Sequence, residues 1–304
     1  MPSEFTFDKN SMKNRQKSFE KVIPTALMAA YRRTFADIPY SSEIFENLKK
    51  ISGKNNYEDI PFDLKKPAPQ FEARHKLIDK LIYETNSDQV LELASGFSSR
   101  GLSMSKENNF NYVELDLPSV IQKKEQIIKG IAAEGGFEMP SNLHFESGNA
   151  LDFESLEKAV KYFNKSKPLV ITNEGLLRYL TKDEKAKVAQ HIHKVLEEFN
   201  GVWITSDISL REMFNKENKI RPNHIAKMSK ITGKDISSNC FETEEEAKKF
   251  FEDLGFSIER HSFMEVYSDL TSPKTLGLSQ QQVKDVMEDA VVYVMKPTDH
   301  NMKI

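Results

Sequence analysis

Residues 88–101 read DQVLELASGFSSRG, and this stretch decides the fold. Residues 90–93 are mostly apolar and predict a buried strand, and the small residues 94–96 predict a tight turn before a helix. In such a connection the backbone N–H groups and the helix dipole face a ligand, and a glycine lets that ligand approach. The turn is a candidate nucleotide cradle, although an ordinary strand-to-helix connection has the same pattern. After Gly96 the next glycine is Gly101, so the three-glycine spacing of dinucleotide-binding proteins is missing.

Composition narrows the class of protein. The 304 residues carry 43 Lys+Arg and 46 Asp+Glu, and this net charge of −3 gives no electrostatic footprint for nucleic acid or an anionic membrane. The single cysteine, Cys240, excludes an intramolecular disulfide and a cysteine cluster for zinc. The first twenty residues are polar, and no later stretch approaches the ~20 apolar residues of a membrane helix. We therefore expect a soluble cytoplasmic protein without a signal peptide.

Strands alternate with helices along most of the chain. A helix over 71–84 precedes the first strand, and further strands are predicted at 111–116, 142–146, 168–172 and 201–207. Two late strands, 256–263 and 290–295, are joined by a long polar linker around Ser272-Pro273, which predicts an antiparallel pair at the sheet edge. We expect an α/β fold with a seven-stranded, mostly parallel sheet and one antiparallel late strand. This arrangement favours a Rossmann-like methyl-transfer fold over a dehydrogenase.

An acid ends the second strand of this sheet. Asp116 closes the strand at 111–116, and Pro118 follows where a helix begins. A carboxylate at this place accepts the two hydroxyl hydrogens of a ribose, and the same residue could serve as the N-cap of the helix. Its place relative to the cradle favours the ribose.

The order of these motifs resembles the leucine carboxyl methyltransferase family, which includes polyketide-associated bacterial O-methyltransferases. The strongest matches are ELDLP at 114–118 and EGLLRYL at 174–180. The resemblance runs roughly from Thr25 to the last strand and is loosest before Pro67. It implies a class I enzyme that depends on S-adenosyl-L-methionine (SAM) and releases S-adenosyl-L-homocysteine (SAH), with no metal.

The resemblance also implies a set of contacts with the cofactor. Ala94 and Gly96 would line its methionine side, Asp116 would hold the ribose hydroxyls, Asn149 and Ala150 would lie by the adenine, Glu174 would lie near the methionine amino group, and Arg74 would pair with the methionine carboxylate. Arg74 could instead be a solvated helix residue, and Arg32 or Arg33 could do similar work. The family usually has an aspartate where Ser98 and Asn149 stand. Asn149 keeps an acceptor in its amide oxygen, so adenine binding survives the change.

Two domains are predicted, because Pro67 and Pro69 mark the boundary of an N-terminal helical region. Residues 1–66 are predicted to form an N-terminal helical cap region, and residues 67–304 the methyltransferase domain. Within that domain, residues 208–240 are too long for a simple loop and are predicted to form a helical lid insertion after the fifth strand.

The expected chemistry needs no general base if the methyl acceptor is a carboxylate, because that group is ionised above a pKa of about 4. Tyr179 is the candidate substrate-facing hydroxyl, although its ring could simply pack under the cap, and Arg178 is the candidate partner for the acceptor carboxylate. The favoured function is O-methyl transfer to a small-molecule carboxylate. A protein C-terminal carboxylate as substrate and a non-catalytic SAM-binding module stay open as alternatives.

Overall fold

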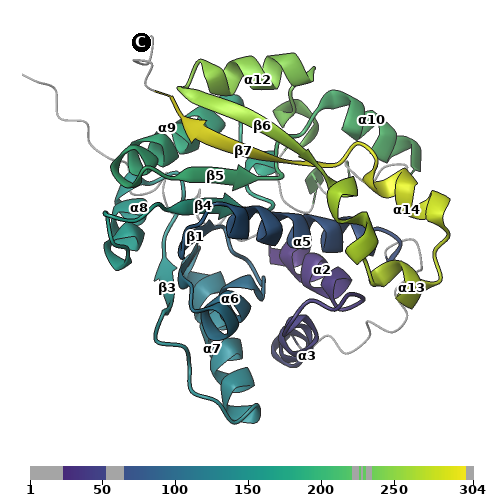
Figure 1. Cartoon of the computed structure of the whole chain (residues 1–304). Helices are drawn as coiled ribbons and strands as arrows, with labels where there is room; N and C mark the ends of the chain where they lie inside the picture. The colour runs from purple at the N-terminus through teal and green to yellow at the C-terminus, as the bar shows by residue number, and fades with distance from the viewer. Residues whose placement is uncertain (1–22, 53–64, 221–225, 227–228, 231–234, 299–304) are drawn as a thin grey trace, which may run out of the picture.

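One sheet organises the molecule. The computed structural model describes residues 23–52, 65–220, 226, 229–230 and 235–298, and these residues form a seven-stranded sheet in the order β3-β2-β1-β4-β5-β7-β6. The strands are β1 (Gln89–Leu93), β2 (Asn111–Asp116), β3 (Leu143–Ser147), β4 (Val170–Asn173), β5 (Val202–Thr205), β6 (Phe256–Ser262) and β7 (Val291–Pro297). Strands β1 to β5 pair in parallel, whereas β7 runs antiparallel to both β5 and β6 (Figure 1). The predicted fold is confirmed.

Helices cover both faces of this sheet. The α-helices are α2 (Ile23–Arg33), α3 (Ser41–Ser52), α5 (Ala68–Glu84), α6 (Arg100–Asn108), α7 (Pro118–Glu134), α8 (Phe153–Ala159), α9 (Lys182–Phe199), α10 (Arg211–Ile220), α12 (Glu244–Glu252), α13 (Ser272–Leu276) and α14 (Gln280–Met287). Short 3-10 helices are η1 (Val160–Tyr162), η2 (Leu177–Tyr179), η3 (Ser237–Asn239) and η4 (Phe263–Asp269). Of the helices in the described ranges, none is both long and apolar enough to span a bilayer.

The central strands alternate between two buried clusters. Val90 of β1 and Tyr112 of β2 pack with α5, α6 and α7, whereas Leu91 and Val113 pack with α8, α9 and α12. Val90 is the register partner of Tyr112, so side chains that face the same way meet across the two strands. Because both faces of β1 are covered, all five of its residues are buried, which explains the apolar run in the sequence.

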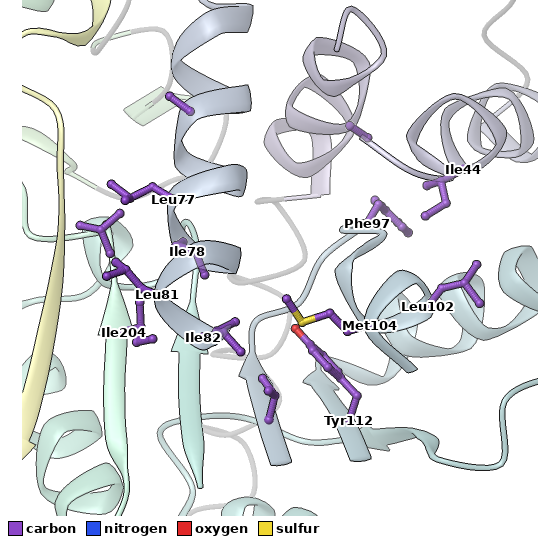
Figure 2. Close-up of a cluster of buried hydrophobic side chains, with 14 of the residues drawn as sticks. Ile44, Leu77, Ile78, Leu81, Ile82, Phe97, Leu102, Met104, Tyr112 and Ile204 are labelled. Carbon is purple, nitrogen blue, oxygen red and sulfur yellow. The ribbon is translucent and has the colours of Figure 1, made fainter. Parts of the chain in front are cut away.

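Helix α5 buries the inner face that the sequence predicts. Its four apolar side chains there are at most 4% exposed: Leu77, Ile78, Leu81 and Ile82. Figure 2 shows them pointing toward the sheet, where Ile204 of β5 lies. Each fully buried aliphatic side chain stabilises the fold by about 1.5–3 kcal/mol. This packing fixes the first turns of α5, which carry Arg74, relative to the strand ends.

The N-terminal helices share the core of the larger domain. Helix α2 lies beside α5 (Figure 1). Ile44 of α3 belongs to the same buried cluster as Phe97 of the cradle, which spans residues 94–99, and Leu102 of α6 (Figure 2). Residues 53–64 of the predicted cap region, and its first 22 residues, lie outside the described residues. The described part of the cap therefore packs directly on the cradle.

The long polar linker predicted between β6 and β7 folds into three short helices, η4, α13 and α14. Ser262 caps η4 in a capping box with Glu265, and Ser279 caps α14 in the same way with Gln282. Part of the polarity that suggested a linker is thus helix capping. Helix α14 then buries Val283 in the cluster on the α5 side of the sheet.

Two backbone hydrogen bonds join the beginning and the end of the segment after β5. The backbone N–H of Phe241 donates to the Ser209 carbonyl (2.9 Å), and the N–H of Arg211 donates to the Phe241 carbonyl (2.8 Å). Phe241 is therefore part of this bridge, and helix α12 starts after it, at Glu244. Helix α10 lies in the segment predicted as a lid, and its role as a lid stays a prediction, whereas residues 221–225, 227–228 and 231–234 lie outside the described residues.

Candidate functional site

Six of the nine predicted site residues lie where four neighbouring parallel strands end, whereas Arg74 lies in α5 and Arg178 and Tyr179 lie in η2. The cradle, residues 94–99, follows β1, and Asp116 is the last residue of β2. Asn149 and Ala150 come after β3, and Glu174 comes directly after β4. The carboxyl ends of parallel strands share one edge of the sheet, which is where open α/β sheets bind ligands.

The cradle makes a sharp turn that is tied to β2. Ala94 and Gly96 both have a positive φ, 52° and 51°. The N–H of Gly96 donates to Oδ2 of Asp116 (2.7 Å), and the N–H of Leu117 donates to Oδ1 (2.7 Å). Burial raises the pKa of Asp116, and these two backbone N–H groups oppose that rise. Leu117 is the N-cap residue of α7, so Asp116 does not fill the N-cap position that the sequence left open.

The N-terminus of α6 leaves polar atoms without partners. Ser99 is the N-cap residue, and its side chain makes no capping hydrogen bond. The hydroxyl oxygens of Ser95 and Ser99 are buried and have no hydrogen-bond partner among the described residues. Buried hydroxyls ordinarily have partners, so these atoms fit a polar ligand in the cradle. Ser98, where the family usually has an aspartate, is buried and accepts the backbone N–H of Arg100 (3.3 Å).

Three arginines surround Glu174. Nη2 of Arg33 (2.8 Å) and Nε of Arg74 (2.6 Å) both donate to its Oε2. Nη2 of Arg100 donates to Oε1 (2.6 Å). Burial alone would raise the pKa of Glu174, but Arg74, Arg33 and Arg100 together hold it well below its ordinary value. The carboxylate is therefore ionised throughout the neutral range.

Arg100 connects this cluster to acids beneath the cradle. Its Nη1 donates to Glu92 (2.9 Å), its Nε donates to Asp79 (2.5 Å), and Nη2 lies 3.1 Å from Nδ1 of His75. Because a guanidinium only donates, Nδ1 accepts and the ring proton of a neutral His75 is on Nε2, 3.3 Å from Asp79. Burial raises the pKa of Asp79 to about 6, and burial followed by the charge of Arg100 lowers the pKa of His75 well below its usual value.

Arg33 and Arg74 keep donors for a ligand. The charge of Arg100 is matched by Glu92 and Asp79, so Glu174 is the acid that both other arginines share. The Nε of Arg33 is buried and has no partner in the part of the chain that the structure describes, and the Arg74 side chain is 17% exposed. Two guanidiniums beside one carboxylate suit a further carboxylate, and Glu174 suits an ammonium group. The cluster therefore matches the two charges of an amino-acid zwitterion.

Asn149 and Ala150 lie in a turn after β3. Oδ1 of Asn149 accepts the N–H of Leu151 (3.0 Å), and the N–H of Asn149 donates to Oγ of Ser155 (3.2 Å). The amide oxygen that was expected to face adenine thus already has one partner, and an amide oxygen has a second lone pair. The adenine role of both residues stays a prediction.

Tyr179 and Arg178 lie in η2, next to the segment after β5. The Tyr179 ring is buried in a small cluster with Phe214, Ile236 and Cys240. The guanidinium carbon of Arg178 lies 6.0 Å from the centre of that ring, and its Nε is buried without a hydrogen-bond partner among the described residues. The ring thus packs on the segment 208–240, in a cluster that holds no residue of the described part of the N-terminal cap region, while the role of the Tyr179 hydroxyl stays a prediction. The role of Arg178 as partner of the acceptor carboxylate also stays a prediction.

Sequence reasoning missed two residues of this site and left a third open. Arg100 and Asp207, both buried, received no role, and Arg33 was not separated from Arg32. The structure separates them, because Arg32 lies over the Phe71 ring (4.8 Å) and Arg33 contacts Glu174. Arg100 bonds to a residue 74 positions away and Asp207 to one 32 positions away, so no local sequence pattern marks either residue. Within the described ranges, no group of three His, Cys, Asp or Glu side chains could hold a metal ion.

A family model described as leucine carboxyl methyltransferase matches residues 41–193. The chain belongs to this family. The matched range contains Arg74, the cradle, Asp116 and Glu174, so the resemblance stated from the motifs is confirmed, and only Arg33 of the Glu174 cluster falls outside it. Among curated proteins, none matches the chain.

Comparison with solved structures finds one that shares the fold of this leucine carboxyl methyltransferase family member and others with weaker similarity, all at low identity. A DUF574 family protein from Streptomyces avermitilis is 12% identical with a TM-score of 0.53, covering 90% of this chain and 97% of its own. An O-methyltransferase family protein from Burkholderia thailandensis is 12% identical with a TM-score of 0.45, covering 85% and 72%. Magnesium protoporphyrin IX methyltransferase from Synechocystis, solved with SAH, is 12% identical with a TM-score of 0.45, covering 83% and 92%.

Proposed function

We propose that this member of the leucine carboxyl methyltransferase family transfers a methyl group from SAM to an oxygen of a small molecule, and that this oxygen belongs to a carboxylate. The observation that carries the proposal is the cluster of three residues formed by Glu174, Arg33 and Arg74. One acid and two cations at the carboxyl end of β4 suit the ammonium and carboxylate groups of a methionine moiety. A nicotinamide cofactor offers no such zwitterion, and the cradle lacks its glycine spacing.

The chain's own residues divide the work of holding the cofactor. Glu174 would accept from the ammonium group, and Arg74 and Arg33 would donate to the methionine carboxylate. Ala94 and Gly96 would line the methionine side, and the unpartnered hydroxyls of Ser95 and Ser99 lie in the same turn. Each carboxylate oxygen of Asp116 accepts one backbone N–H. Each oxygen therefore keeps a second lone pair that could accept one ribose hydroxyl. Asn149 and Ala150 would lie by the adenine. Bound SAM supplies an electrophilic methyl group on a sulfonium.

Alignment is the main contribution expected from the protein. An acceptor carboxylate is already ionised at neutral pH, so no side chain needs to remove a proton. Arg178 would hold that carboxylate, and Tyr179 would orient its oxygen. Holding two reactants in line and away from water supplies about 7–11 kcal/mol of the barrier reduction when the geometry is ideal. The apolar cluster of Tyr179, Phe214 and Ile236 suits such a dry site.

The chemistry of the product tests this proposal. The enzyme is incubated with SAM carrying a labelled methyl group and with separate pools of carboxylic acids, phenols and alcohols. A methyl ester releases volatile labelled methanol in alkali, whereas a methyl ether does not. We expect alkali-labile label from the acid pool and a kcat/KM that is flat between about pH 6 and 8, above the carboxylate pKa. Alkali-stable label, or a rate that rises across this range, would contradict a carboxylate acceptor. Label transferred only to peptides with a free C-terminus would favour a protein substrate.

A further inference from the structure

The run Glu174–Leu180 carries both Glu174 and the Arg178–Tyr179 pair, and a buried carboxylate holds its first half. Asp207, two residues beyond β5, is 4% exposed. Its Oδ1 accepts the N–H of Gly175 (2.7 Å), and its Oδ2 accepts the N–H groups of Leu176 (2.6 Å) and Leu177 (3.2 Å). Oδ2 also accepts Nδ2 of Asn173 (2.7 Å), the last residue of β4. One side chain thus satisfies the donors on both sides of Glu174.

A buried lysine holds the other end of the same run. The side chain of Lys185, in the first turn of α9, is fully buried. Its Nζ donates to the carbonyl of Leu180 (2.9 Å), where the run ends, and to the carbonyl of Asn239 in η3. Asn239 belongs to the segment 208–240, so this ammonium joins the run directly to the segment that packs on Tyr179.

Both groups are unusual choices for stability alone. Buried charges lose hydration, and well-packed apolar residues of similar size are often no worse for stability. What an apolar residue cannot do is fix backbone N–H and carbonyl groups in one arrangement. Gly175 has a φ of 78°, so the backbone next to Glu174 takes a conformation that its own sequence does not enforce.

We propose that Asp207 and Lys185 are positioning residues that clamp the run Glu174–Leu180 at its two ends. Asp207 fixes the backbone from which Glu174 reaches Arg33, Arg74 and Arg100. Lys185 fixes the end that carries Arg178 and Tyr179 against the segment 208–240. The kinetic part of this inference rests on the proposed function, because it assigns Glu174 to the cofactor and Arg178 to the acceptor.

Amide hydrogen exchange tests the clamp without using activity. Asp207→Asn keeps the size of the side chain but turns one acceptor oxygen into a donor, which must then face an N–H group. We expect exchange at the amides of Gly175 to Leu177 to speed up about tenfold or more, because the variant loses one charge-assisted hydrogen bond that protects them. The control is Asp183→Asn, an exposed carboxylate on α9 that should leave these amides unchanged. Unchanged exchange in Asp207→Asn would overturn the clamp, whatever the enzyme does.

Steady-state kinetics separate positioning from general destabilisation. We expect Asp207→Asn to raise the KM for SAM by about tenfold and the acceptor KM much less. Lys185→Met should raise the acceptor KM by about tenfold and the KM for SAM much less. The control Lys187→Met, at an exposed lysine on the same helix, should change neither KM. Equal changes in both KM values for both variants would overturn the assignment of the two ends. If wild type bound no SAH, the proposed function would fail, and the exchange experiment would still decide the clamp.

Discussion

Nε of Arg74 lies 2.6 Å from Oε2 of Glu174, although the two residues are 100 positions apart in the sequence. One residue comes from the helix that precedes the sheet, and the other from the loop after β4. Their contact therefore joins the start of the domain to the middle of the sheet at the proposed methionine site. Arg33 of α2 donates to the same oxygen, which brings the N-terminal cap to this point as well.

Arg74 should matter for the cofactor and not for the acceptor. Arg74→Met removes the charge and all its donors, and we expect the KM for SAM to rise about tenfold or more, as for a lost charge-assisted hydrogen bond. Arg74→Lys keeps the charge without the planar fork and should have a smaller effect. Initial rates at fixed saturating acceptor measure both. The control is Arg260→Met, an exposed arginine on β6. A KM for SAM that stays at the wild-type value in Arg74→Met would count against the methionine site.

Ala94 is strained by its place in the cradle. Its φ of 52° lies in the left-handed region, which costs a residue with a Cβ roughly 1–2 kcal/mol. Ala94→Gly removes that cost, but it also makes the unfolded chain more flexible, which lowers the free energy of unfolding by roughly 0.4–1 kcal/mol. We expect the variant to be more stable by about 0.5–1 kcal/mol, measured by urea unfolding at equilibrium. A clear loss of stability would mean that the Cβ makes a contact worth more than the strain.

Arg178 and Tyr179 should affect different kinetic constants, the acceptor KM and kcat. Arg178→Met removes the proposed carboxylate partner, so we expect the acceptor KM to rise about tenfold while the KM for SAM stays unchanged. Tyr179→Phe keeps the buried ring and removes only the hydroxyl, and we expect kcat to fall by about tenfold or more. Both are measured with the best substrate from the acid pool. If Tyr179→Phe turns over at the wild-type rate, the residue only packs against Phe214 and Ile236.

Lys185 should make stability depend on alkaline pH. Burial lowers the pKa of Lys185 to about 8 in the folded protein, whereas the unfolded chain keeps the ordinary value of about 10.4. Between these values the unfolded state binds more protons, so the contribution of Lys185 to the free energy of unfolding rises with pH. The free energy of unfolding of wild type minus that of Lys185→Met should therefore rise from pH 8 to 10.5, by at most ~3 kcal/mol. Urea unfolding at several pH values, with Lys187→Met as control, measures it. A difference that is constant or shrinks with pH contradicts this.

The sequence predicted those features whose signal is local. The apolar run at 90–93 and the acid at 116 each follow from neighbouring residues, and the structure has both features. Arg100 and Asp207 could not be predicted, because a charged residue becomes a site residue only through partners that the fold brings to it. The three short helices between β6 and β7 were missed because their caps are the same polar residues that mark linkers.

The central claim is that the cluster around Glu174 recognises the methionine part of SAM. Calorimetric titration with SAH tests it most directly, using wild type, Glu174→Gln and the control Glu157→Gln, an exposed glutamate on α8. Glu174→Gln keeps the shape of the side chain and removes the charge that would face the ammonium group under the proposed function. Thermal unfolding of each variant checks that it is folded, because Arg33 and Arg74 lose their shared acid in Glu174→Gln.

We predict that wild type and Glu157→Gln bind SAH with equal affinity and do not bind NAD. Folded Glu174→Gln should bind SAH at least about tenfold more weakly, the cost of losing one hydrogen bond between charged groups. The account is contradicted if wild type binds NAD in preference to SAH, or if Glu174→Gln binds SAH as tightly as wild type.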